Sequence, residues 1–168
     1  MARWATLAIV GVLLLAGVGL VGPKVFAHGG VEVVNQEPGE QLYVAGLRVE
    51  DPSRLDLDGV SQPLVSTALD GRLRRFGMAV RKDIIDVRAL PEARPEPGSS
   101  GTLRVNGRSG CFVNVDGHMV QGTTPVTASI EAGKEIGVSV SCPNQPVWSG
   151  RVMAVPGQEI DVAPHNAP

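Results

Sequence analysis

The sequence predicts an all-β protein: two small antiparallel β-sandwich-like domains behind an N-terminal apolar helix. In residues 113–126, VNVDGHMVQGTTPV, apolar and polar side chains alternate on the two sides of Asp116-Gly117, a pattern typical of a β-hairpin. The chain of 168 residues also has 21 Gly, 13 Pro and few aromatic residues, as expected of short strands joined by tight turns. An internal repeat indicates that there are two such units.

The repeat is found by sliding the sequence along itself by 71 positions. This shift aligns Gly30 with Gly101, Val34 with Val105, Asn35 with Asn106, Gly39 with Gly110, Leu42 with Val113, Val44 with Val115 and Gly46 with Gly117. Further along, a shift of 62 aligns Pro63-Leu64 with Pro125-Val126, which predicts a longer surface loop in the first copy.

The repeat and the composition together predict the domain boundaries. The first β-domain is expected at residues 28–90 and the second at residues 101–163. Residues 91–100, PEARPEPGSS, have the composition of a semi-extended Pro-rich linker. Residues 164–168 are expected to be a tail.

The second copy is predicted to contain seven short strands separated by Gly, Pro, Asp and Asn turn signals. They are Thr102–Asn106, Cys111–Val115, His118–Val120, Val126–Ile130, Glu135–Cys142, Trp148–Val155 and Glu159–Val162.

The N-terminal segment is expected to direct the rest of the chain out of the cytoplasm. Residues 4–22 carry no charge, and this run is longer than a typical signal core but just reaches the roughly 20 residues that span a bilayer. Gly22-Pro23 and the small Ala27 favour a cleavage site. Residues 1–27 are therefore either a cleaved signal peptide or an uncleaved signal anchor, and the protein is expected in the periplasm, secreted or anchored in the inner membrane.

The two cysteines, Cys111 and Cys142, make an even number in an exported chain, so a disulfide is the natural expectation. Each lies at the end of a predicted strand, on its apolar face. Two buried free thiols are the alternative. A catalytic cysteine is disfavoured because no histidine and acid accompany either residue.

Several short motifs of the second copy resemble the PEGA domain, a small β-module of bacterial and archaeal envelope proteins. They are GTLRV at 101–105, VNVDG at 113–117, GTTPV at 122–126, AGK at 132–134, WSG at 148–150 and PGQ at 156–158. The resemblance covers about residues 101–163 and extends weakly to about residues 30–90. It implies a binding or spacer module outside the membrane and supplies no catalytic residues.

Two candidate binding surfaces follow from the residue types. Arg72, Arg74 and Arg75 form a basic strip that could meet an acidic glycan, a phospholipid surface or a protein. A solvated edge strand protected by its charges is the alternative interpretation. Trp148 is expected to cover the sandwich core, with sugar stacking as the alternative.

No metal or cofactor is expected. Asp51, Asp56 and Asp58 form a weak calcium candidate, but they lack the ligand spacing of an EF-hand, and a solvated acidic loop is the simpler interpretation. The three histidines are scattered without zinc-ligand spacing.

The sequence therefore predicts a non-catalytic extracytoplasmic interaction or spacer module of the bacterial cell envelope. Its expected partner is an envelope protein or a cell-wall glycan. The net charge of −2 argues against nucleic acid. The alternatives are the sensor region of a membrane signalling receptor and a hydrolase whose site is dispersed along the chain.

Overall fold

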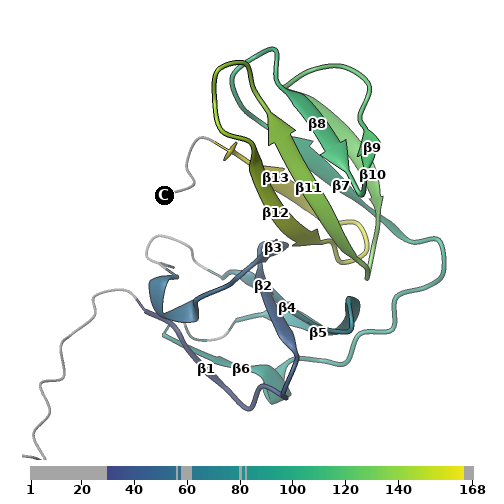
Figure 1. Cartoon of the computed structure of the whole chain (residues 1–168). Helices are drawn as coiled ribbons and strands as arrows, with labels where there is room; N and C mark the ends of the chain where they lie inside the picture. The colour runs from purple at the N-terminus through teal and green to yellow at the C-terminus, as the bar shows by residue number, and fades with distance from the viewer. Residues whose placement is uncertain (1–29, 56, 58–61, 80, 82, 165–168) are drawn as a thin grey trace, which may run out of the picture.

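The computed structural model describes residues 30–55, 57, 62–79, 81 and 83–164. They form thirteen short strands and two 3-10 turns, and most strand pairs are antiparallel (Figure 1), so the all-β prediction is confirmed. The predicted N-terminal helix lies outside the described residues. Among the described residues, no helix has the length and apolar character needed to cross a membrane.

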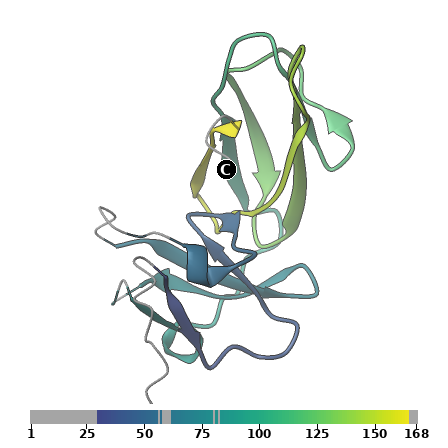
Figure 2. The same ribbon diagram turned by 60° about the vertical axis from the view of Figure 1, so that its left-hand side comes forward.

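The largest sheet has eight strands in the order β5-β4-β2-β3-β12-β11-β8-β9. In that order they are Arg72–Met78, Leu64–Leu69, Gln41–Val44, Leu47–Arg48, Trp148–Met153, Glu135–Ser141, Phe112–Val115 and His118–Met119. The first four come from residues 30–93, the N-terminal half, and the last four from residues 100–164, the C-terminal half. One sheet therefore runs through both halves, which lie one above the other in Figure 2.

The hairpins β2–β3 and β8–β9 have the same turn. Its first residue has a positive φ in both halves, 52° at Ala45 and 47° at Asp116. The following glycines have φ angles of 83° at Gly46 and 84° at Gly117. Two successive residues with positive φ make the turn that matches the twist of a two-residue hairpin, as predicted for Asp116-Gly117.

The strand pairing shows that the two halves are structural repeats. The pairs β2–β3, β2–β4 and β4–β5 of the N-terminal half correspond to β8–β9, β8–β11 and β11–β12 of the C-terminal half. Val44 pairs with Val65, and its counterpart Val115 pairs with Val138. Strand β4 therefore corresponds to β11, at a shift of 73.

The predicted shift of 62 in this part of the chain is wrong. It placed Pro63-Leu64 on Pro125-Val126, but Val126 begins β10, which belongs to a different sheet. Short alternating strands resemble one another at several shifts, so the sequence alone did not distinguish β10 from β11.

The C-terminal half is a sandwich. Strands β10 (Val126–Glu131), β7 (Ser100–Val105) and β13 (Glu159–Val162) form a second sheet in that order. Buried side chains from both sheets fill the space between them: Leu103, Val105, Cys111, Val113, Ile130, Ile136, Val138, Val140, Val152, Ala154, Ile160 and Val162. Every strand predicted for this half is present, with ends within two residues of the prediction.

The N-terminal half has a smaller core of the same kind. Strand β1 (Glu32–Val34) pairs in parallel with β6 (Ile84–Asp86), as β7 pairs in parallel with β13. The 3-10 turns η1 (Pro52–Arg54) and η2 (Val87–Ala89) complete this half. Its buried core consists of Val31, Leu42, Val44, Leu57, Val65, Ala79, Ile85 and Leu90.

The predicted linker begins as a strand-like cover on β5. The Phe76 N–H donates to the Pro91 carbonyl at 3.1 Å, and the Ala93 N–H donates to the Arg74 carbonyl at 2.7 Å. Residues 91–93 thus lie antiparallel along the outer edge of β5, where they satisfy backbone groups that an edge strand would otherwise leave unpaired.

The two halves meet in a third buried group, here called the junction cluster: Tyr43, Ala68, Leu73, Met153 and Val155. Backbone hydrogen bonds cross between the halves around it. The Met153 N–H donates to Gly46 at 2.8 Å, the Leu73 N–H to Gly133 at 2.9 Å and the Glu135 N–H to Gly71 at 2.9 Å. The halves therefore share both a sheet and a core.

Candidate functional site

The open side of β12 is the main candidate site. Strand β3 pairs with β12 only through Leu47 and Val152 and then leaves it. The Val49 N–H donates instead to Leu42 at 2.9 Å, which keeps the chain after β3 on β2. Within the described part of the chain, no strand pairs with the same side of β12 from Val147 to Arg151, and this stretch of backbone is called the β12 edge.

Backbone groups on the β12 edge point away from the sheet. Neighbouring residues of an antiparallel strand direct their N–H and C=O groups to opposite sides. Since the Met153 N–H points to the β3 side, where it donates to Gly46, the N–H groups of Arg151 and Ser149 point the same way. An added strand could therefore hydrogen-bond to β12 there.

Below this edge, between the two sheets of the sandwich, lies a mainly apolar cavity of about 640 Å³, the inner cavity. The half-buried Trp148 side chain forms one wall and packs against the C-terminal core. A Cβ atom at Gly150 would lie 2.8 Å from the Trp148 ring, so glycine lets the indole lie flat along the strand. The cavity is lined by Leu47, Arg48, Glu50, Trp148, Ser149, Gly150, Arg151, Asp161, Val162 and Ala163.

On the opposite face of β12 lies a polar cavity of about 550 Å³, the outer cavity. It is lined by Glu50, Asn114, Asp116, Gly117, Gly137, Val138, Ser139, Ser149, Gly150 and Arg151. Gly137 lies in its floor, and a Cβ there would meet only Asp116 Oδ1, at 3.6 Å. Packing therefore does not require glycine at this strand position, where a small residue keeps the cavity open.

A group of charged side chains around Glu135 lies where the outer face of β12 meets the N-terminal half. The Glu135 carboxylate accepts a hydrogen bond from the Tyr43 hydroxyl and lies 3.4 Å from Arg48 and 3.3 Å from Arg151. Burial, together with the hydrogen bond to Glu135, raises the pKa of Tyr43. The Arg48 Nε atom lies 3.1 Å from Glu50 without hydrogen-bond alignment, so that contact is an ion pair.

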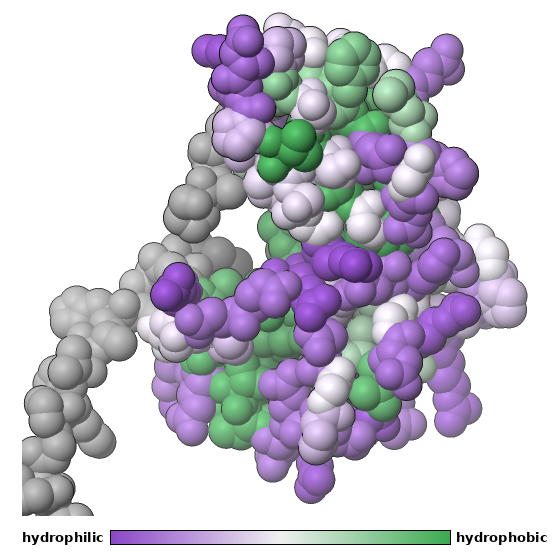
Figure 3. Space-filling model, in the orientation of Figure 1, coloured by the Kyte–Doolittle hydropathy of each residue, from purple (hydrophilic) through white to green (hydrophobic). Residues whose placement is uncertain are grey.

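Exposed apolar side chains are found both beside the β12 edge and away from it. Val147, directly before Trp148, is 62% exposed, and Phe112 and Met119 on β8 and β9 are 51% and 70% exposed. On the face drawn in Figure 3, hydrophobic side chains form small groups among hydrophilic ones. The site thus offers backbone hydrogen bonds, one apolar cavity and one polar cavity.

The structure does not bring the predicted basic strip and Trp148 together, because β5 and β12 are separated in the sheet. Arg74 forms an ion pair with Glu37 at 2.5 Å, which lowers the pKa of that carboxyl. Arg75 pairs with Glu92 at 3.3 Å. Arg72 lies opposite Lys134 in a bridge between the halves. Two of the three arginines therefore have acidic partners within the chain.

The calcium candidate is described only in part. Asp51 caps η1: its carboxylate accepts from the Ser53 N–H at 3.1 Å and the Ser53 hydroxyl at 2.6 Å, and these bonds lower the pKa of Asp51. Arg54 lies 3.2 Å from the same carboxylate. Asp56 and Asp58 lie outside the described residues. Among the described residues, no group of three or more His, Cys, Asp or Glu could hold a metal ion.

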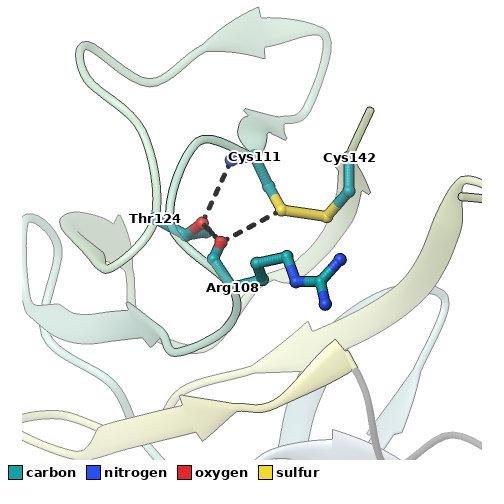
Figure 4. The surroundings of a disulfide bond; sticks show 4 residues. All are labelled: Arg108, Cys111, Thr124 and Cys142. Atoms are coloured by element: carbon teal, nitrogen blue, oxygen red, sulfur yellow. Dashed lines mark hydrogen bonds between the residues drawn. A yellow bond between two sulfur atoms is a disulfide. The ribbon is translucent and has the colours of Figure 1, made fainter. Parts of the chain in front are cut away.

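The predicted disulfide between Cys111 and Cys142 is present (Figure 4). Thr124, a residue of the GTTPV motif, fixes the loop beside it. Its hydroxyl donates to the Arg108 carbonyl and accepts from the Cys111 N–H at 3.2 Å. The Arg108 carbonyl also lies 3.2 Å from the Cys111 sulfur, a contact rather than a hydrogen bond because a disulfide sulfur carries no hydrogen.

Sequence reasoning missed most of the site. Trp148 was identified, but Gly150 was noted only as part of the WSG motif and not as the residue that leaves room for the Trp148 ring. Glu135 and Tyr43 carried no recognisable pattern, because they are 92 residues apart and meet only when the halves pack together.

Comparison of the chain with protein-family models, with curated proteins and with solved structures finds no match.

Proposed function

We propose that this chain is a non-catalytic interaction module of the bacterial cell envelope that acts outside the cytoplasm. It binds an envelope protein or a cell-wall glycan at the β12 edge. The observation that supports this proposal best is that two cavities of opposite polarity meet along a sheet edge that strand β3 leaves open.

Three further observations agree with this function. The disulfide is compatible with an oxidising compartment. The apolar run at residues 4–22 would carry the following residues across the membrane as a signal peptide or anchor. The motifs at residues 101–163 resemble the PEGA domain, whose members are envelope modules without enzymatic activity.

The junction between the halves supports a binding role over a flexible spacer. Glu50 of the N-terminal half and Arg151 of the C-terminal half line both cavities. Because the halves share a sheet and the junction cluster, these walls keep their relative positions without a ligand. A preformed site loses less conformational entropy on binding than one that a ligand must assemble.

The test is binding of the purified full chain to an envelope extract and, separately, to sedimented cell-wall glycan. We expect the wild-type chain to retain either an envelope protein or the glycan. Trp148→Ala should retain much less of the same partner. Phe112→Ala, at an exposed position outside both cavities, is the control and should bind as the wild type does. Retention of neither partner, or equal retention by all three chains, would contradict the proposal.

A further inference from the structure

We infer that the β12 edge binds an extended peptide segment of a partner protein as an added antiparallel strand. The inference rests on the proposed function and specifies the chemistry of the partner. The fold itself contains the precedent, because residues 91–93 occupy the corresponding edge of the N-terminal half.

The register of the repeats establishes which residues correspond. Val65 pairs with Gly77 on β5, and its counterpart Val138 pairs with Gly150 on β12. Gly77 therefore corresponds to Gly150. By the same register Phe76 corresponds to Ser149 and Arg75 to Trp148. The next residues back along the chain are Arg74, which lies at a bulge in β5, and Val147, which directly precedes β12.

On β5, two hydrogen bonds hold the covering segment. The Phe76 N–H donates to Pro91, and the Arg74 carbonyl accepts from Ala93. The corresponding groups are the Ser149 N–H on β12 and the carbonyl of Val147, the residue directly before the strand. The Ser149 N–H points to the open side of β12, and a strand that continued back through Val147 would direct that carbonyl to the same side. Within the described residues neither group has a backbone partner. The same two bonds are therefore available to an incoming peptide.

The cavities indicate which side chains the peptide carries. On β5 the residue opposite Arg75 is Glu92, and the two form an ion pair. The residue opposite Trp148 would instead face the inner cavity, between Trp148, Leu47 and Val162. Because side chains of a strand alternate between faces, the next residues would face the polar outer cavity. The preferred peptide has a central apolar residue between polar neighbours.

The experiment uses a synthetic peptide of residues 88–96 of this chain carrying Glu92→Leu, and the same peptide with Glu92. The tested proteins are the oxidised full chain and its Ser149→Pro and Ser129→Pro variants. Proline at 149 removes the N–H that an added strand needs but none that pairs β12 with β11.

Ser129→Pro is a matched control. Ser129 is an exposed serine on β10, the outer strand of the other sheet. The Ala132 N–H points toward β7, where it donates to the Ser99 carbonyl. Since N–H groups of neighbouring residues in a strand point to opposite sides, the Ser129 N–H points away from β7. In both variants, proline therefore replaces a residue whose N–H points away from the paired strand. Leu47→Glu is a second variant, which places a charge in the lining of the inner cavity and changes no residue of β12.

We expect the Glu92→Leu peptide to bind the wild type and Ser129→Pro alike, and more tightly than the Glu92 peptide. Binding should weaken by about tenfold or more in Ser149→Pro and in Leu47→Glu, because a backbone hydrogen bond or an apolar contact is lost. The Ser149 amide should exchange with solvent more slowly once the peptide is bound.

In the peptide experiment, the inference would be overturned if neither peptide binds, if the peptide binds Ser149→Pro as tightly as the wild type, or if the wild type self-associates and Ser149→Pro does not. Such self-association would assign the edge to a second copy of the chain. Retention of cell-wall glycan by both wild type and Ser149→Pro would overturn the inference and leave the proposed function standing. Retention of no partner by the wild type would instead contradict the proposed function itself.

Discussion

The Tyr43 hydroxyl of the N-terminal half donates a hydrogen bond to the Glu135 carboxylate of the C-terminal half. Tyr43 is fully buried, and the Glu135 side chain is 15% exposed. The bond lies at one end of the junction cluster, where Arg48 and Arg151 also approach the carboxylate. A single side-chain pair thus links the junction cluster to Arg151, which lines the outer cavity.

Tyr43→Phe should lower the free energy of unfolding by about 1.5–3 kcal/mol, the usual contribution of a hydrogen bond to a charged group. Denaturant unfolding measures this loss. The control is Tyr43→Phe in a Glu135→Gln background, where the remaining partner is neutral and the loss should be smaller. Equal losses in both backgrounds would show that the charge of Glu135 does not contribute.

The raised pKa of Tyr43 predicts a loss of stability in alkali. The ordinary value is 10.0, and the folded chain holds the proton more tightly than the unfolded chain does. The stabilisation that Tyr43 contributes to the folded state is therefore complete below about pH 10. It declines as the pH rises further, because the unfolded chain releases the tyrosine proton first. Tyr43 is the only tyrosine in the sequence, so tyrosinate absorbance reports it directly. An ordinary titration midpoint would contradict the prediction, and Tyr43→Phe should lack this component of the pH dependence.

Gly46→Ala should destabilise the protein more than Gly117→Ala does. Both glycines have a positive φ in equivalent turns, so both variants carry similar backbone strain of about 1 kcal/mol. Only at Gly46 would the new Cβ meet another side chain, Ile160, at 2.5 Å. The clash should add about 1–3 kcal/mol.

The comparison isolates the contact between the β2–β3 hairpin and the C-terminal core, and thermal unfolding of both variants measures it. If the two variants lose the same stability, the turn at Gly46 does not pack against the C-terminal half as described.

Replacing both Cys111 and Cys142 by alanine should cost about 3–4 kcal/mol, since the bridge closes a loop with a sequence separation of 31. Denaturant midpoints of the oxidised chain and the double variant measure the cost. A reductant should lower the denaturant midpoint of the wild type and leave the midpoint of the double variant unchanged. A difference below about 1 kcal/mol would mean that the bridge does not restrict the unfolded chain.

Local patterns predicted much of the fold. Alternation along the strands, the Asp116-Gly117 turn and the pair of cysteines depend on neighbouring residues or on a simple count, and all three appear in the structure. The repeat was also detected, at the correct shift through Gly46 and Gly117.

Strand partners were harder to predict because many short alternating segments can pair with one another. The sequence therefore gave no indication that β3 would join β12, or that residues 91–93 would cover β5. The candidate site depends on both facts. Ser149 has no distinctive chemistry of its own. Its N–H indicates a binding site only because the equivalent N–H of Phe76 donates a hydrogen bond to Pro91.

The proposed binding site depends on a difference between equivalent edges of the two repeats, because the β5 edge is covered and the β12 edge is open. Amide hydrogen exchange of the free, oxidised full chain tests it most directly, by comparing the N–H groups of Phe76 and Ser149. We expect the Phe76 amide, bonded to Pro91, to be protected and the Ser149 amide to exchange far faster. Equal protection of the two amides, or a protected Ser149 beside an unprotected Phe76, would contradict the account.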